Sequence, residues 1–262
     1  MKFLLILLVL LSNLIFSQKL DSSFIECKYL VAFLIDTANI NTLKKELVYL
    51  RIGKNSSLFR SDFKEKADSI TFAEIDKSNK NPENGIAIMR TEKWASAKYT
   101  PEVFNNKNKI IIYDKILNVT YNYEVEEKAK WNFLNETKKI QGYTCKKAIG
   151  KYHNKVITVW YTEEIPISEG PYTFKNLPGL VLEAYDSKDY FHFTLESLKR
   201  VVKPIRPLEG TVSTEYSKFT KKRSDIFNDP IGAFVGIFGK TPPKQDHERM
   251  IKNIRSINNY LD

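Results

Sequence analysis

The sequence contains few of the residues that carry most enzyme chemistry. Among its 262 residues there are three histidines and two cysteines. It has no Gly-x-Ser-x-Gly elbow, no His-Glu-x-x-His pair, no phosphate loop and no dinucleotide fingerprint. These absences argue against the hydrolases, zinc proteases and nucleotide-binding proteins that carry such motifs. The sequence therefore predicts no metal site, no cofactor and no catalytic residue.

The sequence also lacks a hydrophobic run long enough to cross a bilayer. The apolar stretch from Phe3 to Phe16 would span only about 20 Å as a helix, against roughly 30 Å of hydrocarbon core. A basic second residue, this stretch and the small Ser17 predict a signal peptide over residues 1–17, cleaved before Gln18. An uncleaved anchor is the competing interpretation. No cysteine follows the stretch directly, so a lipid anchor is not expected.

Positive charge dominates the composition. The formal net charge is +10, and removal of Lys2 with the signal peptide would leave +9. The basic residues are spread along the chain and accompany no nucleic-acid-binding motif, which predicts a solvated basic surface and no nucleic-acid partner. Attraction to anionic surfaces of the cell envelope remains open.

The two cysteines, Cys27 and Cys145, lie far apart in the sequence. An exported protein can form a disulfide between two such residues, which here would join the first strand to the middle of the sheet. Two buried thiols that act as small hydrophobic side chains are the alternative. The sequence leaves both interpretations open.

Alternation of β-branched or aromatic residues with polar ones predicts a mainly β protein. The expected strands are Phe24–Ile35, Glu46–Ile52, Lys109–Tyr113, Leu117–Val125, Trp131–Glu136, Cys145–Tyr152, Val156–Thr162, Leu180–Tyr185 and Tyr190–Ser197. Short polar turns between them indicate an antiparallel meander. We expect a curved antiparallel sheet, a half-barrel like that of lipoprotein carriers, with C-terminal helices packed on it.

Residues 18–262 are expected to form a single domain, because no linker rich in Pro, Gly or Ser divides them. A helical tail begins near residue 208, with one helix around Tyr216–Phe227 and another over Gln245–Leu261. The polar stretch from Ala67 to Lys107 predicts an insertion between strands.

Three blocks in the middle of the chain resemble a known family. The first holds Gly142, Tyr143 and Cys145; the second holds Trp160, Tyr161, Ile165, Pro166, Gly170, Pro171 and Phe174; the third holds Leu177, Pro178, Gly179 and Leu180. In order and spacing they resemble the GLPGLI family of Bacteroidetes, most closely over Trp131–Leu195. The resemblance implies an exported envelope protein of a family without an established activity. Asn176 and Val181 depart from the family motif, in place of Gly and Ile.

The third block predicts a particular backbone geometry. Pro178-Gly179 suits the centre of a type II turn, in which Gly179 would have a positive φ. Asn at position 176, where the family has Gly, also suggests a positive φ. The loop from Ile165 to Leu180 is stiffened by its prolines and bordered by aromatic residues. It is either a plug that closes one end of the sheet or the rim of a binding site.

The leading functional hypothesis is a non-catalytic binding or carrier protein of the periplasm or cell surface. Its expected partner is an apolar ligand or an outer-membrane protein. An envelope hydrolase whose residues meet only in the fold, with Glu183 and Asp186 as weak acid and base candidates, is one alternative. An accessory subunit of an outer-membrane receptor is the other. A deep apolar cavity would favour the carrier. A cleft with two converging carboxylates or a His–carboxylate pair would favour the hydrolase, and a flat exposed apolar patch would favour the accessory.

Overall fold

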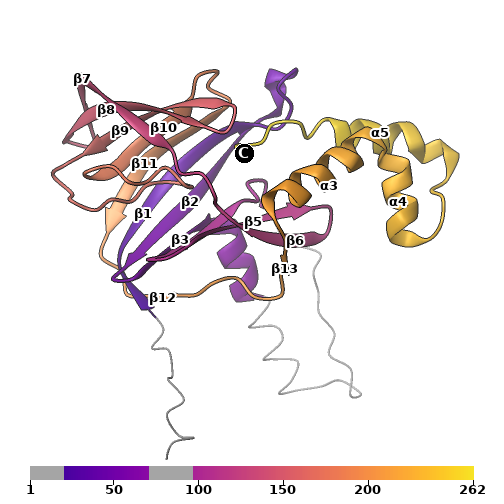
Figure 1. Ribbon diagram of the computed structural model, residues 1–262, viewed down its shortest axis with the longest axis horizontal. Coiled ribbons are helices and arrows are strands. Elements are labelled where there is room, and N and C mark those ends of the chain that lie inside the picture. The colour runs from indigo at the N-terminus through magenta and orange to yellow at the C-terminus, as the bar shows by residue number, and fades with distance from the viewer. Residues whose placement is uncertain (1–20, 71–96) are drawn as a thin grey trace, which may run out of the picture.

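The computed structural model describes residues 21–70 and 97–262 (Figure 1). The expected signal peptide over 1–17 and the centre of the expected insertion, residues 71–96, lie outside the described residues. In the described part the strands form one curved sheet that does not close on itself. The predicted mainly β fold with C-terminal helices is therefore confirmed.

Over residues 21–70 and 97–262 the sheet has 13 strands, and all nine predicted strands are among them. Their bounds are β1 Asp21–Leu34, β2 Leu43–Gly53, β3 Ser56–Ser61, β4 Glu102–Asn106, β5 Ile110–Ile116, β6 Val119–Glu124, β7 Lys130–Ile140, β8 Tyr143–Tyr152, β9 Lys155–Thr162, β10 Leu180–Asp186, β11 Phe191–Lys199, β12 Pro204–Ile205 and β13 Val212–Ser213. Across the sheet the order is β13-β6-β5-β4-β3-β2-β1-β11-β10-β9-β8-β7, and β12 pairs with β1.

The long strand β1 joins the two halves of the sheet. It pairs antiparallel with β2, where Val31 lies opposite Glu46, and with β11, where Val31 lies opposite Phe193. The other pairs along the meander are also antiparallel, and among the strands of the described residues only the short β13 lies parallel to its neighbour, β6. This central position makes β1 the strand on which both halves of the sheet depend.

The space enclosed by the curved sheet is filled with aromatic side chains. Tyr29, Phe59, Tyr99, Phe174 and Phe193 are each at most 1% exposed. Phe193 contacts Phe59, Tyr99 and Phe174 edge-on, with ring centroids 6.0–6.1 Å apart. Edge-to-face pairs at this separation are favourable, so the interior is a packed core.

The C-terminal helices differ from expectation in number and position. They are α3 (Tyr216–Asn228), α4 (Pro230–Phe238) and α5 (His247–Arg255), with a short 3-10 turn η2 at Lys244–Asp246. Helix α3 packs on β6, because Phe219 contacts the rings of Tyr121 and Tyr123. Helices α4 and α5 pack against α3 and extend away from the sheet (Figure 1). Helix α4, between the two predicted helices, was not predicted.

Two short helical segments lie outside this C-terminal unit. The 3-10 turn η1 covers Ile40–Thr42, and residues 62–70 form a helix.

The predicted helix over Gln245–Leu261 ends early, because the last residues return to the sheet. The backbone N–H of Asn258 donates to Ile35 O at 3.2 Å, and Asn259 Nδ2 donates to Leu34 O at 2.8 Å. Leu261 is buried. No helix in the described ranges is long and apolar enough to cross a bilayer.

The two cysteines do not pair. Both thiols are free and buried, Cys27 on β1 and Cys145 on β8. Strands β11, β10 and β9 lie between β1 and β8 in the sheet. Neighbouring strands are about 4.8 Å apart, so β1 and β8 are four such spacings apart along the sheet. A disulfide requires the two Cα atoms to lie within roughly 7 Å. Of the two interpretations that the sequence left open, the structure favours two buried thiols.

Candidate functional site

The loop between β9 and β10 lies inside the curved sheet. Tyr172, Phe174 and Leu177 are at most 2% exposed, and Trp131 on β7 donates its indole N–H to Lys175 O at 2.7 Å. A rim for a ligand would leave these rings exposed. The loop is therefore the plug that the sequence offered as one of two interpretations.

A buried ion pair fixes the plug to the opposite half of the sheet. Lys175 Nζ pairs with the Glu169 carboxylate, and their side chains are 3% and 13% exposed. Ser57 Oγ on β3 accepts from Lys175 Nζ and donates to Glu169 Oε1, each at 2.9 Å. Asn105 on β4 donates to the same carboxylate at 3.0 Å. Each polar group thus has partners, as a buried charge requires.

Gly179 is needed for a reason other than the predicted one. Its φ is not positive, so the type II turn at Pro178-Gly179 does not form as expected. A Cβ at Gly179 would instead lie 1.9 Å from Thr162 O, so the backbone comes too close for any side chain. The positive φ angles of this loop are at Tyr172 (53°) and Asn176 (66°). The expectation for Asn176 is confirmed.

The other residues of the motif lie on the strands that border the plug. Gly142, with φ 85°, and Tyr143 lie at the β7–β8 turn, and Cys145 follows on β8. Trp160 and Tyr161 are buried on β9. Leu180 begins β10, and its N–H donates to Ile165 O at 3.0 Å. Pro166, Gly170, Pro171, Leu177 and Pro178 lie in the loop itself. The motif therefore builds the plug and its supports.

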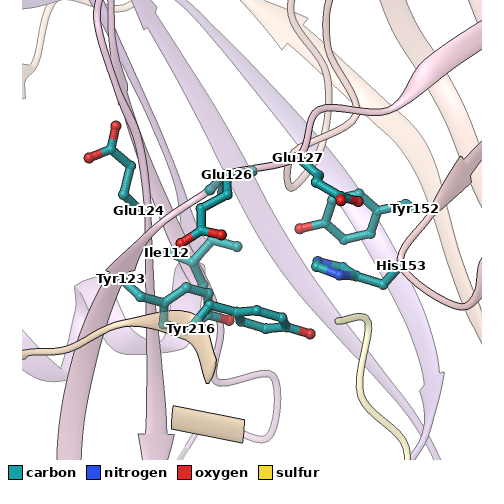
Figure 2. Close-up of a pocket in the computed structure, with 9 residues that line it drawn as sticks. Ile112, Tyr123, Glu124, Glu126, Glu127, Tyr152, His153 and Tyr216 are labelled. Carbon is teal, nitrogen blue, oxygen red and sulfur yellow. The ribbon is translucent and has the colours of Figure 1, made fainter. Parts of the chain in front are cut away.

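A pocket with an aromatic wall lies elsewhere, between β6, the β8–β9 turn and α3 (Figure 2). It encloses about 150 Å³ and is lined by Ile112, Tyr123, Glu124, Val125, Glu126, Glu127, Tyr152, His153 and Tyr216. The His153 ring stacks on Tyr216 with centroids 4.8 Å apart and meets Tyr152 edge-on at 4.4 Å. The Tyr123 ring lies 5.4 Å from that of Tyr216. Aromatic rings thus form most of the wall.

Three glutamates lie at this pocket, and they differ in their contacts. Glu124 forms an ion pair with Lys109 at 2.8 Å and points away from the others (Figure 2). The carboxylate of Glu126 points toward Tyr123 and Tyr216 (Figure 2), and Glu127 is near enough for its charge to raise the pKa of Tyr216. Within the described part of the chain, neither Glu126 nor Glu127 has a hydrogen-bond or ion-pair partner. Two free acceptor groups therefore face an aromatic wall.

The tyrosines of the pocket stay protonated. Burial raises the pKa of Tyr152 to about 12, and burial together with the charge of Asp262 raises the pKa of Tyr216 to about 12. Tyr123 Oη donates to Asp262 Oδ2 at 3.3 Å, and Arg223 holds the same carboxylate at 2.9 Å. The C-terminal Asp262 thereby holds the Tyr123 side chain in the wall of the pocket.

Comparison with protein families shows the family of this chain. Residues 63–215 match the model described as the N-glycanase peptide N-terminal domain. The chain belongs to this family. No curated protein matches it. Two solved structures of PNGF-II, in space groups P21 and C2, have TM-scores of 0.48 and 0.46 at 16% and 19% identity. Each alignment covers 76% of this chain and 32% of PNGF-II, so the chain spans about a third of that protein's length.

In this protein, a His–carboxylate cluster lies on the outer face of the sheet. His192 on β11 places Nε2 at 3.0 Å from Glu183 Oε1 and Nδ1 at 2.7 Å from Asp189 Oδ1. Glu183 also pairs with Lys138, whose ammonium lies 4.4 Å from the Trp160 ring centroid. The hydrogen bond to Glu183, and then that to Asp189, raise the pKa of His192. Both ring nitrogens are occupied, so neither is available to take a proton from a nucleophile.

Two further sets of side chains with catalytic chemistry are buried inside the protein. Ser61-Asp62-Phe63-Lys64 matches the Ser-x-x-Lys pattern of acyl-enzymes. Ser61 is fully buried and donates to Glu46, while Lys64 Nζ is bound by Glu102 at 2.6 Å. Burial raises the pKa of Asp114 to about 6, but this side chain is bound by Thr100 Oγ1 at 2.8 Å and is largely shielded from solvent. Neither group can reach a substrate in this structure.

Proposed function

We propose that the protein is an exported, non-catalytic carbohydrate-binding protein of the cell envelope, which holds a sugar of its ligand in the pocket of Figure 2. The observation that carries the proposal is the pair of unpartnered carboxylates, Glu126 and Glu127, beside the rings of Tyr152, His153 and Tyr216. Sugars present apolar C–H faces and hydroxyl donors together, and this wall offers partners for both.

The size and the family support the same conclusion. A pocket of about 150 Å³ is smaller than the roughly 300–1,000 Å³ of a site for a drug-sized ligand, so it holds one ring of a longer molecule. The family model is named after an N-glycanase, whose name refers to glycans on proteins. We propose that this chain shares the glycan as ligand and supplies recognition.

The expected apolar ligand is not part of this proposal. Aromatic side chains fill the interior of the sheet, where a lipid carrier would need an open cavity. A second pocket, of about 310 Å³, is lined mainly by polar residues, among them Asn154, Lys155, Asp186 and Asn258. Neither pocket has the lining that a lipid needs.

Export and the finer family assignment belong to the same proposal. The basic, apolar and small-residue pattern of residues 1–17 supports a signal peptide, and the three motif blocks support membership of the GLPGLI family. N-terminal sequencing of the protein from envelope fractions is the measurement for export. A first residue at Gln18 supports it, and retention of Met1 refutes it.

An array of immobilised ligands tests the function. The array carries N-glycans released from glycoproteins, other envelope polysaccharides and, as a separate class, primary and quaternary amines. We expect binding to glycans. Binding to amines alone would mean that the carboxylates recognise a cation against the rings, and it would refute the carbohydrate proposal. Binding to nothing on the array would refute it as well.

A further inference from the structure

Helix α4 is apolar on every side. Its nine residues, Pro-Ile-Gly-Ala-Phe-Val-Gly-Ile-Phe, include no polar side chain. A helix of this composition is normally buried on all sides. Here Ile237 and Phe238 are each 53% exposed, at the end of the helix that lies farthest from its cap at Asp229.

The helix is nevertheless firmly built. Asp229 caps its start by accepting from Gly232 N–H at 2.9 Å, and Pro230 occupies the first turn, where its missing N–H does no harm. Gly239, with φ 67°, ends it in the left-handed conformation. The Phe234 and Phe238 rings contact each other with centroids 4.5 Å apart. The exposed end is therefore a defined surface, which we call the α4 tip: Ile237, Phe238, Lys240 and Lys244.

The position of the α4 tip leaves it open to a partner. Helices α4 and α5 pack on α3, and α4 turns away from the sheet at the edge of the molecule (Figure 1). The pocket of Figure 2 is built from other elements, with only Tyr216 of α3 in common with this helical unit. A ligand at the α4 tip would not obstruct that pocket.

The charge beside the apolar end is positive. Lys240 follows directly after the Gly239 cap, and Lys244 begins η2. In the ranges that the structure describes, neither lysine forms an ion pair, whereas the nearby Asp246 is already paired with Arg249 at 2.6 Å. Two unpaired ammonium groups thus follow the two exposed apolar side chains in the chain.

We propose that the α4 tip docks the protein on an anionic phospholipid surface, with Ile237 and Phe238 entering the boundary between headgroups and acyl chains. Apolar insertion combined with attraction of lysines to anionic lipid is how peripheral proteins hold to membranes. Protein interfaces are generally depleted of lysine, which favours lipid over a protein partner. The nine-residue helix would span about 14 Å, too short to cross the bilayer, so it lies at the interface.

Vesicle co-sedimentation of the full chain tests this surface. The vesicles are phosphatidylcholine alone or phosphatidylcholine with phosphatidylglycerol, and neither contains carbohydrate, so the result is independent of the glycan proposal. We expect binding to the anionic vesicles, weakened by added salt. The double variant Ile237→Ser/Phe238→Ser should bind at least about tenfold more weakly. Lys240→Gln/Lys244→Gln should lose the salt dependence.

Ile40→Ser is the matched control, because Ile40 is 70% exposed on the separate turn η1. It should bind as the parent does, and unchanged thermal melts should show that all variants fold. Absence of parental binding, or full binding by the Ile237→Ser/Phe238→Ser variant, would overturn the proposal. So would a parental dimer in sedimentation that this variant abolishes, because the α4 tip would then be a contact between two copies.

Discussion

Lys175 and Glu169 form a buried ion pair inside the curved sheet, with side chains 3% and 13% exposed. The pair belongs to the loop between β9 and β10 and is shared with Ser57 of β3 and Asn105 of β4. It therefore joins the half of the sheet that carries the family motif to the half that carries the N-terminal strands.

Breaking this pair from one side should destabilise the protein strongly. Lys175→Met leaves the Glu169 carboxylate buried without its cation, which costs about 3–5 kcal/mol. The double variant Lys175→Met/Glu169→Leu removes both charges and should recover most of the loss. Urea unfolding of both variants gives the comparison. A single variant within about 1 kcal/mol of the parent would mean that the pair does not hold the plug.

Gly179 should be intolerant of any side chain. In Gly179→Ala the new Cβ would lie 1.9 Å from Thr162 O, so the β9–β10 connection has to move, at a cost of about 1–3 kcal/mol or more. Gly236→Ala is the control, since nothing lies within 4 Å of its Cβ and helical alanine is favoured by about 0.5–1 kcal/mol. Thermal or urea melts decide the matter. Equal stability of the Gly179→Ala variant and the parent would rule out the close approach.

His192 should make stability depend on pH above about 6.5. Hydrogen bonds to Glu183 and Asp189 raise its pKa in the folded state above the ordinary value of about 6.5. The stabilisation is fully present below about pH 6.5 and is lost as the pH rises through the folded pKa. Unfolding free energies of the parent and His192→Gln should therefore converge toward higher pH. An NMR titration midpoint for His192 below 6.5 would contradict this assignment.

The two thiols should be present but unreactive. Burial raises the pKa of Cys27 to about 12 and that of Cys145 to about 11, so little thiolate exists at neutral pH. Alkylation of the native protein should label neither cysteine. Unfolding without reductant should then allow both to be labelled, as intact mass would show. If labelling after unfolding required a reductant, a disulfide would be present and the structure would be wrong on this point.

The sequence predicted most of the sheet but missed particular strands for physical reasons. In β3, Ser57, Leu58, Phe59 and Ser61 are all buried, so both faces of the strand are covered and no alternation of polar and apolar residues appears. Strand β4 fell within the polar stretch taken for an insertion. Helix α4 was not predicted, because its two glycines and lack of a polar face resemble no surface helix.

The candidate site could not be predicted, because its residues come from separate parts of the chain. Tyr123, Glu127, His153 and Tyr216 meet only when α3 folds back onto β6. His153 and Glu126-Glu127 lie in short polar stretches between predicted strands, and such stretches are ordinarily surface turns. The motif, by contrast, was recognisable but is structural. Its spacing reflects how the plug fits between β9 and β10.

Titration calorimetry with N-glycans released from a glycoprotein tests the central claim most directly. The parent should bind, and Tyr216→Ala should bind at least about tenfold more weakly, because it removes the ring on which His153 stacks. Glu127→Gln should also weaken binding, by loss of a charged acceptor. Glu136→Gln is the control and should bind as the parent does, because Glu136 is an exposed residue of β7 that pairs with Lys147 of β8. Equal affinity of the parent, Tyr216→Ala and Glu127→Gln would place carbohydrate recognition outside this pocket and contradict the account.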